Sequence, residues 1–224
     1  MNVPKPGHAA TRGLSALVLC GLLAAATALA QPAARPERAS RLIGQEVPAG
    51  DGGQLRLHDI VVQAGTGTLL HGVAAGDQPV PLERLGVQGP GASPAPGERR
   101  AAVRLREVVG ARLANGNGDP IGGVEDVVLD FGASKVDFVV VRFDKEWLGT
   151  PKRVAVPWRA LLGRSGEGTW RLDADPARAL SLPELPREQL QRIGDEAVAQ
   201  DVHRKLRQTP WLRSSQSGLQ LEAD

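Results

Sequence analysis

Residues 103–164 contain the feature that most constrains the fold, a series of short apolar runs separated by turn residues. The runs are rich in β-branched residues and lie at residues 103–105, 124–129, 138–143 and 154–156. Each run is bounded by Gly, Asn, Asp or Pro, which is typical of short antiparallel strands joined by tight turns. The pattern predicts a small β-barrel or a tightly curled sheet.

An earlier part of the chain shares the pattern of this stretch. Three blocks recur in the same order: residues 42–44, 57–62 and 80–82 return as residues 108–110, 124–129 and 156–158. Self-similarity of this kind indicates a duplicated structural unit. We therefore predict a mainly β protein with two tandem small barrels, a diverged one at residues 41–88 and a better formed one at residues 103–173.

Two further segments complete the predicted organisation. Residues 89–102 are rich in Pro and Gly, which disfavours regular structure and is typical of a linker. In residues 187–208 the apolar side chains recur mostly at steps of three or four, between Pro186 and Pro210. This spacing predicts a C-terminal amphipathic α-helix that packs on the sheet.

The second copy resembles the PRC-barrel domain, a family named after the photosynthetic reaction centre H subunit. The resemblance rests on an Asn/Asp/Gly turn, on Ile121-Gly122 leading into residues 124–130, and on the run Val-Ala-Val-Pro-Trp at residues 154–158. It implies two tandem PRC-barrel-like units, each a small and strongly bent β-barrel. It also implies use as an assembly or docking module, and the family has no shared catalytic constellation to carry over.

The first 30 residues have the pattern of a secretory signal peptide. Lys5 and Arg12 precede an uncharged apolar run, residues 14–30, which ends in Ala-Leu-Ala. A positive start, an apolar middle and small residues at the end are typical of such signals. We expect cleavage after Ala30, a periplasmic or secreted mature protein, and no membrane span after cleavage. An uncleaved N-terminal membrane anchor is the alternative.

Cleavage would also remove the cysteine and the excess of positive charge. Cys20 lies in the apolar run, so the mature chain would have no thiol for disulfides, catalysis or iron–sulfur clusters. Removing Lys5 and Arg12 from the 27 basic residues leaves 25, which equals the 25 acidic residues. A mature chain without net charge does not favour a nucleic-acid partner, which needs a concentrated positive patch.

The turn at residues 115–119 suggests a metal site. Asn115, Asn117, Asp119 and the later Asp126 have the spacing of oxygen ligands in a calcium loop. Pro120 stands where such a loop needs Gly, and the Asp126 side chain is shorter than the usual Glu. The favoured interpretation is a plain hairpin turn, since Asn-Gly is a preferred hairpin dipeptide. No metal or cofactor is expected.

Asp126 also aligns with Asp59 of the first copy. A carboxylate at the start of an apolar run in both copies is suited to accept hydrogen bonds from backbone amides at a strand corner.

His58, His71 and His203 have no partner at metal-ligand spacing, and we expect them on the solvated surface. The sequence contains no complete catalytic set, so it predicts a protein that is not an enzyme. A hydrolase would need a Ser, a His and a carboxylate close together, and the sequence gives no reason to expect any such three residues to meet.

The segment 144–153 has no counterpart in the first copy and is our candidate site for a protein partner. A Trp on a cationic loop is a reasonable contact point. The candidate partner-binding residues are Lys145, Trp147, Leu148, Lys152 and Arg153. The alternative is that Trp147 folds back over the open end of its own barrel.

These patterns lead to two functional hypotheses. The first is a non-enzymatic docking or scaffold protein of the cell envelope, whose partner is a protein that the sequence does not identify. The second is a periplasmic protein that binds a small ligand or an ion such as Ca²⁺.

Overall fold

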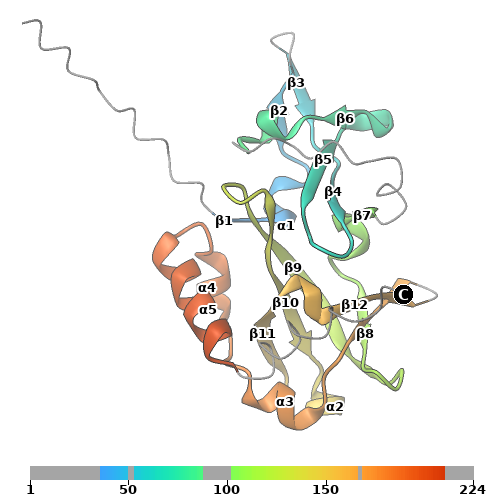
Figure 1. Ribbon diagram of the computed structural model, residues 1–224, viewed down its shortest axis with the longest axis vertical. Helices are drawn as coiled ribbons and strands as arrows, with labels where there is room; N and C mark the ends of the chain where they lie inside the picture. Colours follow the sequence, from blue (N-terminus) through green and yellow to red (C-terminus); the bar gives the residue numbers. More distant parts are fainter. Residues whose placement is uncertain (1–35, 50–52, 88–101, 166–167, 210–224) are drawn as a thin grey trace, which may run out of the picture. The chain divides into compact units, whose positions relative to one another are not determined.

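The computed structural model describes residues 36–49, 53–87, 102–165 and 168–209 (Figure 1). The predicted signal peptide, residues 1–30, lies outside the described residues, and so does the predicted linker apart from Ala102. Of the described residues, 40% are in strands and 30% in helices, so the fold is mainly β. Among the described helices, none is long and apolar enough to cross a membrane.

The larger sheet curls into a half-barrel. Its strands follow the order β11-β10-β9-β8-β13-β12, and β1 pairs with β9 off this path. Neighbouring strands are antiparallel except for β13 and β8. The strands are β1 (Pro36–Arg38), β8 (Arg112–Ala114), β9 (Pro120–Asp130), β10 (Lys135–Phe143), β11 (Lys152–Val156), β12 (Leu161–Ser165) and β13 (Thr169–Leu172).

The long strands β9 and β10 are buried on both faces over much of their length. Val127 and Leu129 belong to the main core, whereas Val128 belongs to a second apolar cluster with Phe138 and Val140. Successive side chains of a strand point to opposite faces. The continuous apolar runs that predicted these strands therefore reflect two separate cores, one inside the curled sheet and one outside it.

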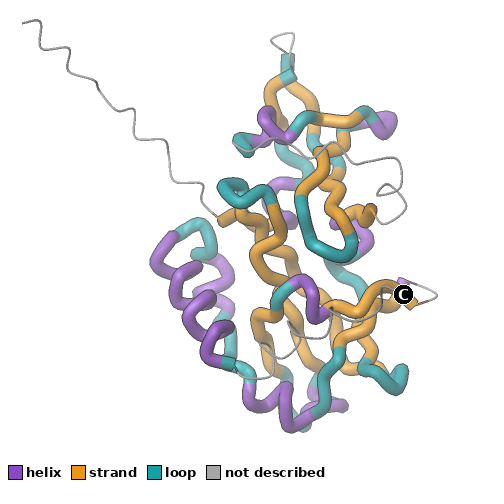
Figure 2. The backbone as a smooth tube through the Cα atoms, in the orientation of Figure 1, coloured by secondary structure: helices purple, strands orange, loops and turns teal. Residues whose placement is uncertain are grey.

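The strands before position 88, together with β7, form two smaller sheets (Figure 2). Strands β2 (Glu46–Pro48) and β3 (Gln54–Arg56) make an antiparallel hairpin. A four-stranded sheet has the order β6-β5-β4-β7. Its strands are β4 (Asp59–Gln63), β5 (Leu69–Val73), β6 (Pro79–Val80) and β7 (Ala102–Arg104). The region is rich in strands, as predicted, but the structure does not show a second barrel.

Short helical segments link the strands. They are α1 (Ala39–Leu42), η1 (Ala75–Asp77), η2 (Leu82–Leu85), η4 (Leu105–Glu107), α2 (Lys145–Leu148), η5 (Trp158–Ala160) and α3 (Pro176–Ser181). The sequence did not lead us to predict α3. Its local signals are ordinary ones, because Asp175 caps the first turn by accepting a hydrogen bond from the Arg178 amide and Pro176 occupies the first helical position.

The prediction of one C-terminal helix over residues 187–208 was wrong. The structure has two helices, α4 (Arg187–Gln191) and α5 (Glu196–Gln208). The carboxylate of Asp195 accepts a hydrogen bond from the Ala197 amide at 3.0 Å, and such an N-cap starts a new helix. The predicted packing is present, because Leu190, Ile193 and Val202 join the cluster on the outer face of β9, β10 and β11.

Candidate functional site

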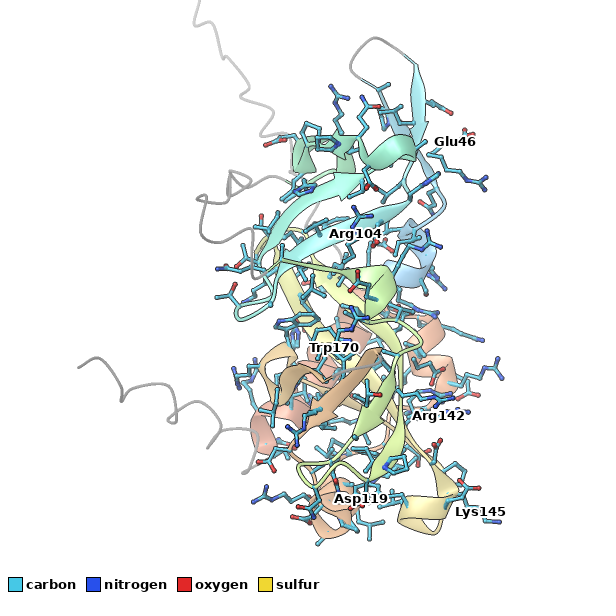
Figure 3. The ribbon with its side chains drawn as sticks, turned by 90° about the vertical axis from the view of Figure 1, so that its right-hand side faces the viewer. Glu46, Arg104, Asp119, Arg142, Lys145 and Trp170 are labelled. Atoms are coloured by element: carbon cyan, nitrogen blue, oxygen red, sulfur yellow. The ribbon has the colours of Figure 1, made fainter. Side chains whose placement is uncertain are left out.

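The segment proposed from the sequence as a docking loop packs closely against the sheet. Leu148, at the end of α2, is buried. Trp147 is half-buried, and its ring centroid lies 5.2 Å from that of Phe143. Trp147 also packs against the main core. Lys145 is exposed at the start of the helix (Figure 3).

Two cationic side chains of the same segment, those of Lys152 and Arg153, bind to other groups within the protein. Nζ of Lys152 donates to the carbonyl oxygens of Ala179 at 3.2 Å and Leu180 at 2.6 Å, near the end of α3. Burial lowers the pKa of Lys152. Nε of Arg153 donates to Oε2 of Glu125 at 2.5 Å. Lys152 and Arg153 therefore make contacts within the protein, whereas Lys145 is exposed.

Trp147 lines a groove that the sequence did not predict. The groove, called the Trp147 groove below, has a volume of about 430 Å³. It is lined by Asn115, Gly116, Asn117, Asp119, Trp147, Asp173, Ala174, Asp175 and Pro176. The structure thus places the Asn115 turn and the Trp147 segment together, although they are far apart in the chain. No spacing in the sequence signals this, because the contact depends on how the sheet curls.

The four metal candidates do not meet at one point. Oδ1 of Asn115 accepts hydrogen bonds from the amides of Asn117 at 3.0 Å and Asp119 at 2.9 Å. Nδ2 of Asn115 donates to Oδ2 of Asp119 at 2.9 Å. These contacts are those of an Asx-type turn. Asp126 is bound elsewhere, and no group of three or more His, Cys, Asp or Glu suited to a metal occurs among the described residues.

Asp126 is fully buried and bound by residues from the beginning of the described chain. Oδ2 accepts from Nε of Arg38 and from Oγ of Ser40, each at 2.6 Å. Oδ1 accepts from the amides of Ser40 at 3.1 Å and Val127 at 2.9 Å. The predicted role of Asp126, bonding backbone amides at a strand corner, is confirmed.

Asp59 has the same role in the first half. Oδ1 accepts from the amides of Ile60 at 2.8 Å and Arg106 at 3.1 Å. Burial raises the pKa of Asp59, while the two amide hydrogen bonds and the nearby Arg104 act against this rise. The sequence predicted the type of contact but not that residues of the opposite half would supply part of it.

A second groove, also of about 430 Å³, concentrates positive charge. It is lined by Gly110, Gly123, Val124, Glu125, Arg142, Arg153 and Arg187. Arg142 and Arg153 are directly opposite each other on β10 and β11. Like charges at such positions repel, and Glu125 is the one carboxylate in the lining. We call this the arginine groove; its residues come from separate elements, so the sequence did not reveal it.

Comparison with known families identifies a PRC-barrel domain within the chain. Residues 101–178 match that family. They form a PRC-barrel domain. The resemblance inferred from the second copy is thereby confirmed, and no curated protein sequence matches the chain. The PRC-barrel domain includes both grooves except Arg187, and it ends before α4 and α5.

His203 connects α5 to the PRC-barrel domain. Its Nε2 lies 2.5 Å from Oδ1 of Asp137, and its ring meets Phe138 edge-on with centroids 6.2 Å apart. The hydrogen bond to Asp137 raises the pKa of His203. Of the three histidines expected on the solvated surface, His58 is exposed, whereas His71 and His203 are partly buried.

Proposed function

We propose that the protein is a non-enzymatic docking or scaffold protein of the cell envelope, with two PRC-barrel-like units in tandem. The Trp147 groove is the observation that carries the docking role. A half-buried Trp, held by Phe143 and flanked by polar groups, resembles the anchor residues that dominate protein interfaces. The envelope location rests on the leader at residues 1–30.

The charges around the groove define the kind of partner. Asp119, Asp173 and Asp175 line it, and Arg178 lies 3.4 Å from Asp173 and 3.2 Å from Asp175. Three carboxylates beside one indole favour a segment that presents a Lys or Arg next to an apolar side chain. A cation over an indole ring adds a favourable electrostatic contact.

The second unit is supported by matching strand registers. In the hairpin of the first half, Glu46 pairs with Arg56. In the PRC-barrel domain, Arg112 pairs with Gly123, and these positions continue the alignment of the two copies. The same order of strand, turn and strand in both halves favours a common origin for the two units.

The docking proposal is tested by site-specific crosslinking. A photoreactive side chain in place of Lys145 should capture one main protein from envelope extract, and Trp147→Ala should remove this product. The matched control carries the same group in place of Leu162, which is exposed on β12. Equal capture from both positions, or capture that Trp147→Ala does not change, would contradict the proposal.

A second candidate function is the binding of a small anionic ligand, and the arginine groove favours it. Three guanidinium groups around one cavity suit a phosphate or a dicarboxylate. Pyrophosphate should raise the melting temperature above that in NaCl of equal ionic strength, because a ligand of the native state stabilises it. The rise should disappear in Arg142→Gln. A calcium-dependent rise that Asp119→Asn abolishes would point instead to ion binding in the Trp147 groove.

A further inference from the structure

Two strands cross between the halves of the chain. β1 precedes the first half, yet it pairs with β9 of the PRC-barrel domain, with Arg38 opposite Val128. β7 begins the PRC-barrel domain, yet it pairs with β4 of the first half, with Arg104 opposite Val61. Each half therefore contains a strand supplied by the other.

The two crossings have the same register. The alignment of residues 42–44 with 108–110, continued towards the N-terminus, places Arg38 on Arg104. The alignment of residues 57–62 with 124–129 places Val61 on Val128. The pair Arg38 and Val128 therefore corresponds to the pair Arg104 and Val61. If the two crossings were unrelated contacts, their paired residues would not be expected to align with each other in this way.

The buried aspartates repeat the exchange. Asp126 accepts from the amide of Ser40 at 3.1 Å, and Asp59 accepts from the amide of Arg106 at 3.1 Å. Ser40 aligns with Arg106, and Asp59 aligns with Asp126. Asp126 and Asp59 are almost inaccessible residues, at 0% and 3% exposure, so each carboxylate needs the hydrogen bonds that the other half supplies.

A third contact lies between the turns of the two main hairpins. The Leu69 amide donates to the Ser134 carbonyl at 2.9 Å, and the Val136 amide donates to the Gly67 carbonyl at 2.8 Å. The alignment of residues 57–62 with 124–129, continued towards the C-terminus, places Leu69 on Val136 and Gly67 on Ser134. Exchanging the two copies converts one of these bonds into the other. Such reciprocity is characteristic of a twofold, self-complementary interface.

We infer that the chain is an internal twofold pair, in which each half docks a strand-and-turn arm of the other. The first arm is residues 36–42 and binds β9, and the second arm is residues 102–107 and binds β4. The partner that fits each arm-binding edge is the opposite half of the same chain. This inference stands on the registers and hydrogen bonds and does not depend on the proposed docking function.

The inference has a direct test in the full chain. A recognition sequence for a specific protease is placed within residues 88–101, and the purified protein is cut there. The two fragments should remain together as one species in size-exclusion chromatography and native mass spectrometry, because the arms bind by backbone pairing and buried hydrogen bonds. Fragments that separate or precipitate on cleavage would overturn the inference.

Substitutions in the arms make the test specific. Arg38→Gln, Ser40→Ala and Asp59→Asn should each speed separation of the cut fragments by about tenfold or more, since each weakens a buried charged hydrogen bond across the interface. The control is Arg142→Gln, an exposed change on β10 outside both arms. Ser40→Ala is the mildest change and keeps the test valid if another variant does not fold. Equal separation rates in the control and in all arm variants would refute the role of the arms.

Discussion

Gly122 is the position where the larger sheet leaves no room for a side chain. Its φ of 149° lies outside the range that other residues adopt easily, and a Cβ there would collide with the carbonyl oxygen of Arg142 on the neighbouring strand. Relief of this collision requires β9 and β10 to separate at the point where they pair.

We therefore expect Gly122→Ala to lower the free energy of unfolding by about 3 kcal/mol or more. Gly118→Ala is the matched control, because Gly118 has a φ of 93° but open space around its Cβ position. The control should lose only about 1 kcal/mol, the usual cost of a left-handed backbone. Urea unfolding followed by tryptophan fluorescence measures both; equal losses would show that the collision is unimportant.

The contact between His203 and Asp137 should make stability depend on pH. The pKa of His203 is raised in the folded state mainly by the hydrogen bond to Asp137; burial and Arg207 oppose this rise, and Asp130 adds a small favourable effect. A raised folded pKa means that this contribution is fully present below the unfolded pKa of about 6.5. It is lost as the pH rises through the folded pKa.

His203→Gln tests this dependence. The difference in melting temperature between the wild-type protein and His203→Gln should be largest near about pH 5.5 and should shrink towards about pH 8.5. The comparison with the variant removes the effect of other titrating groups. A difference that stays constant over this range would mean that protonation of His203 does not contribute.

At the scale of elements, α4 and α5 depend on the outer face of the half-barrel. Ile193 lies between the two helices and is fully buried in the cluster with Phe138 and Val140. Ile193→Ala should cost about 2–4 kcal/mol, the range for truncating a buried aliphatic side chain. It should also speed proteolysis within residues 187–208.

Glu188→Ala serves as the control for this prediction, because Glu188 is exposed on α4. Its proteolysis rate should stay close to that of the wild-type protein. Mass spectrometry of early cleavage products locates the cuts. Early cuts in the larger sheet instead of the helices would show that the helices do not detach first.

At the scale of the whole molecule, the exchanged arms predict cooperative unfolding. Trp170 is buried in the PRC-barrel domain and donates to the Glu107 carbonyl within it, so its fluorescence reports the unfolding of this domain. Hydrogen exchange of the β4 and β5 amides reports the first half. Each half supplies one strand to the sheet of the other half. We therefore expect both probes to give the same urea midpoint. Two separate midpoints would mean that the halves are independent domains.

The sequence predicted local structure better than long-range contacts. The apolar runs at residues 124–129 and 138–143 correctly predicted β9 and β10, because their β-branched side chains fit a buried strand. The break near Asp195 was missed because a single step of five, from Ile193 to Val198, was treated as a minor irregularity in the apolar spacing. The partners of Asp126 and the Trp147 groove were missed for another reason: they join segments about 30 to 90 residues apart, and one sequence contains no signal for such contacts.

The exchange of arms also limits what a piece of this protein can be expected to do. A fragment cut at the borders of the family match, residues 101–178, would keep β7 without the strand that it pairs with. It would also expose the edge of β9 and bury Asp126 without the guanidinium of Arg38. We therefore expect that the stretch marked by sequence similarity does not fold by itself, and that its soluble expression depends on supplying the missing segments in trans.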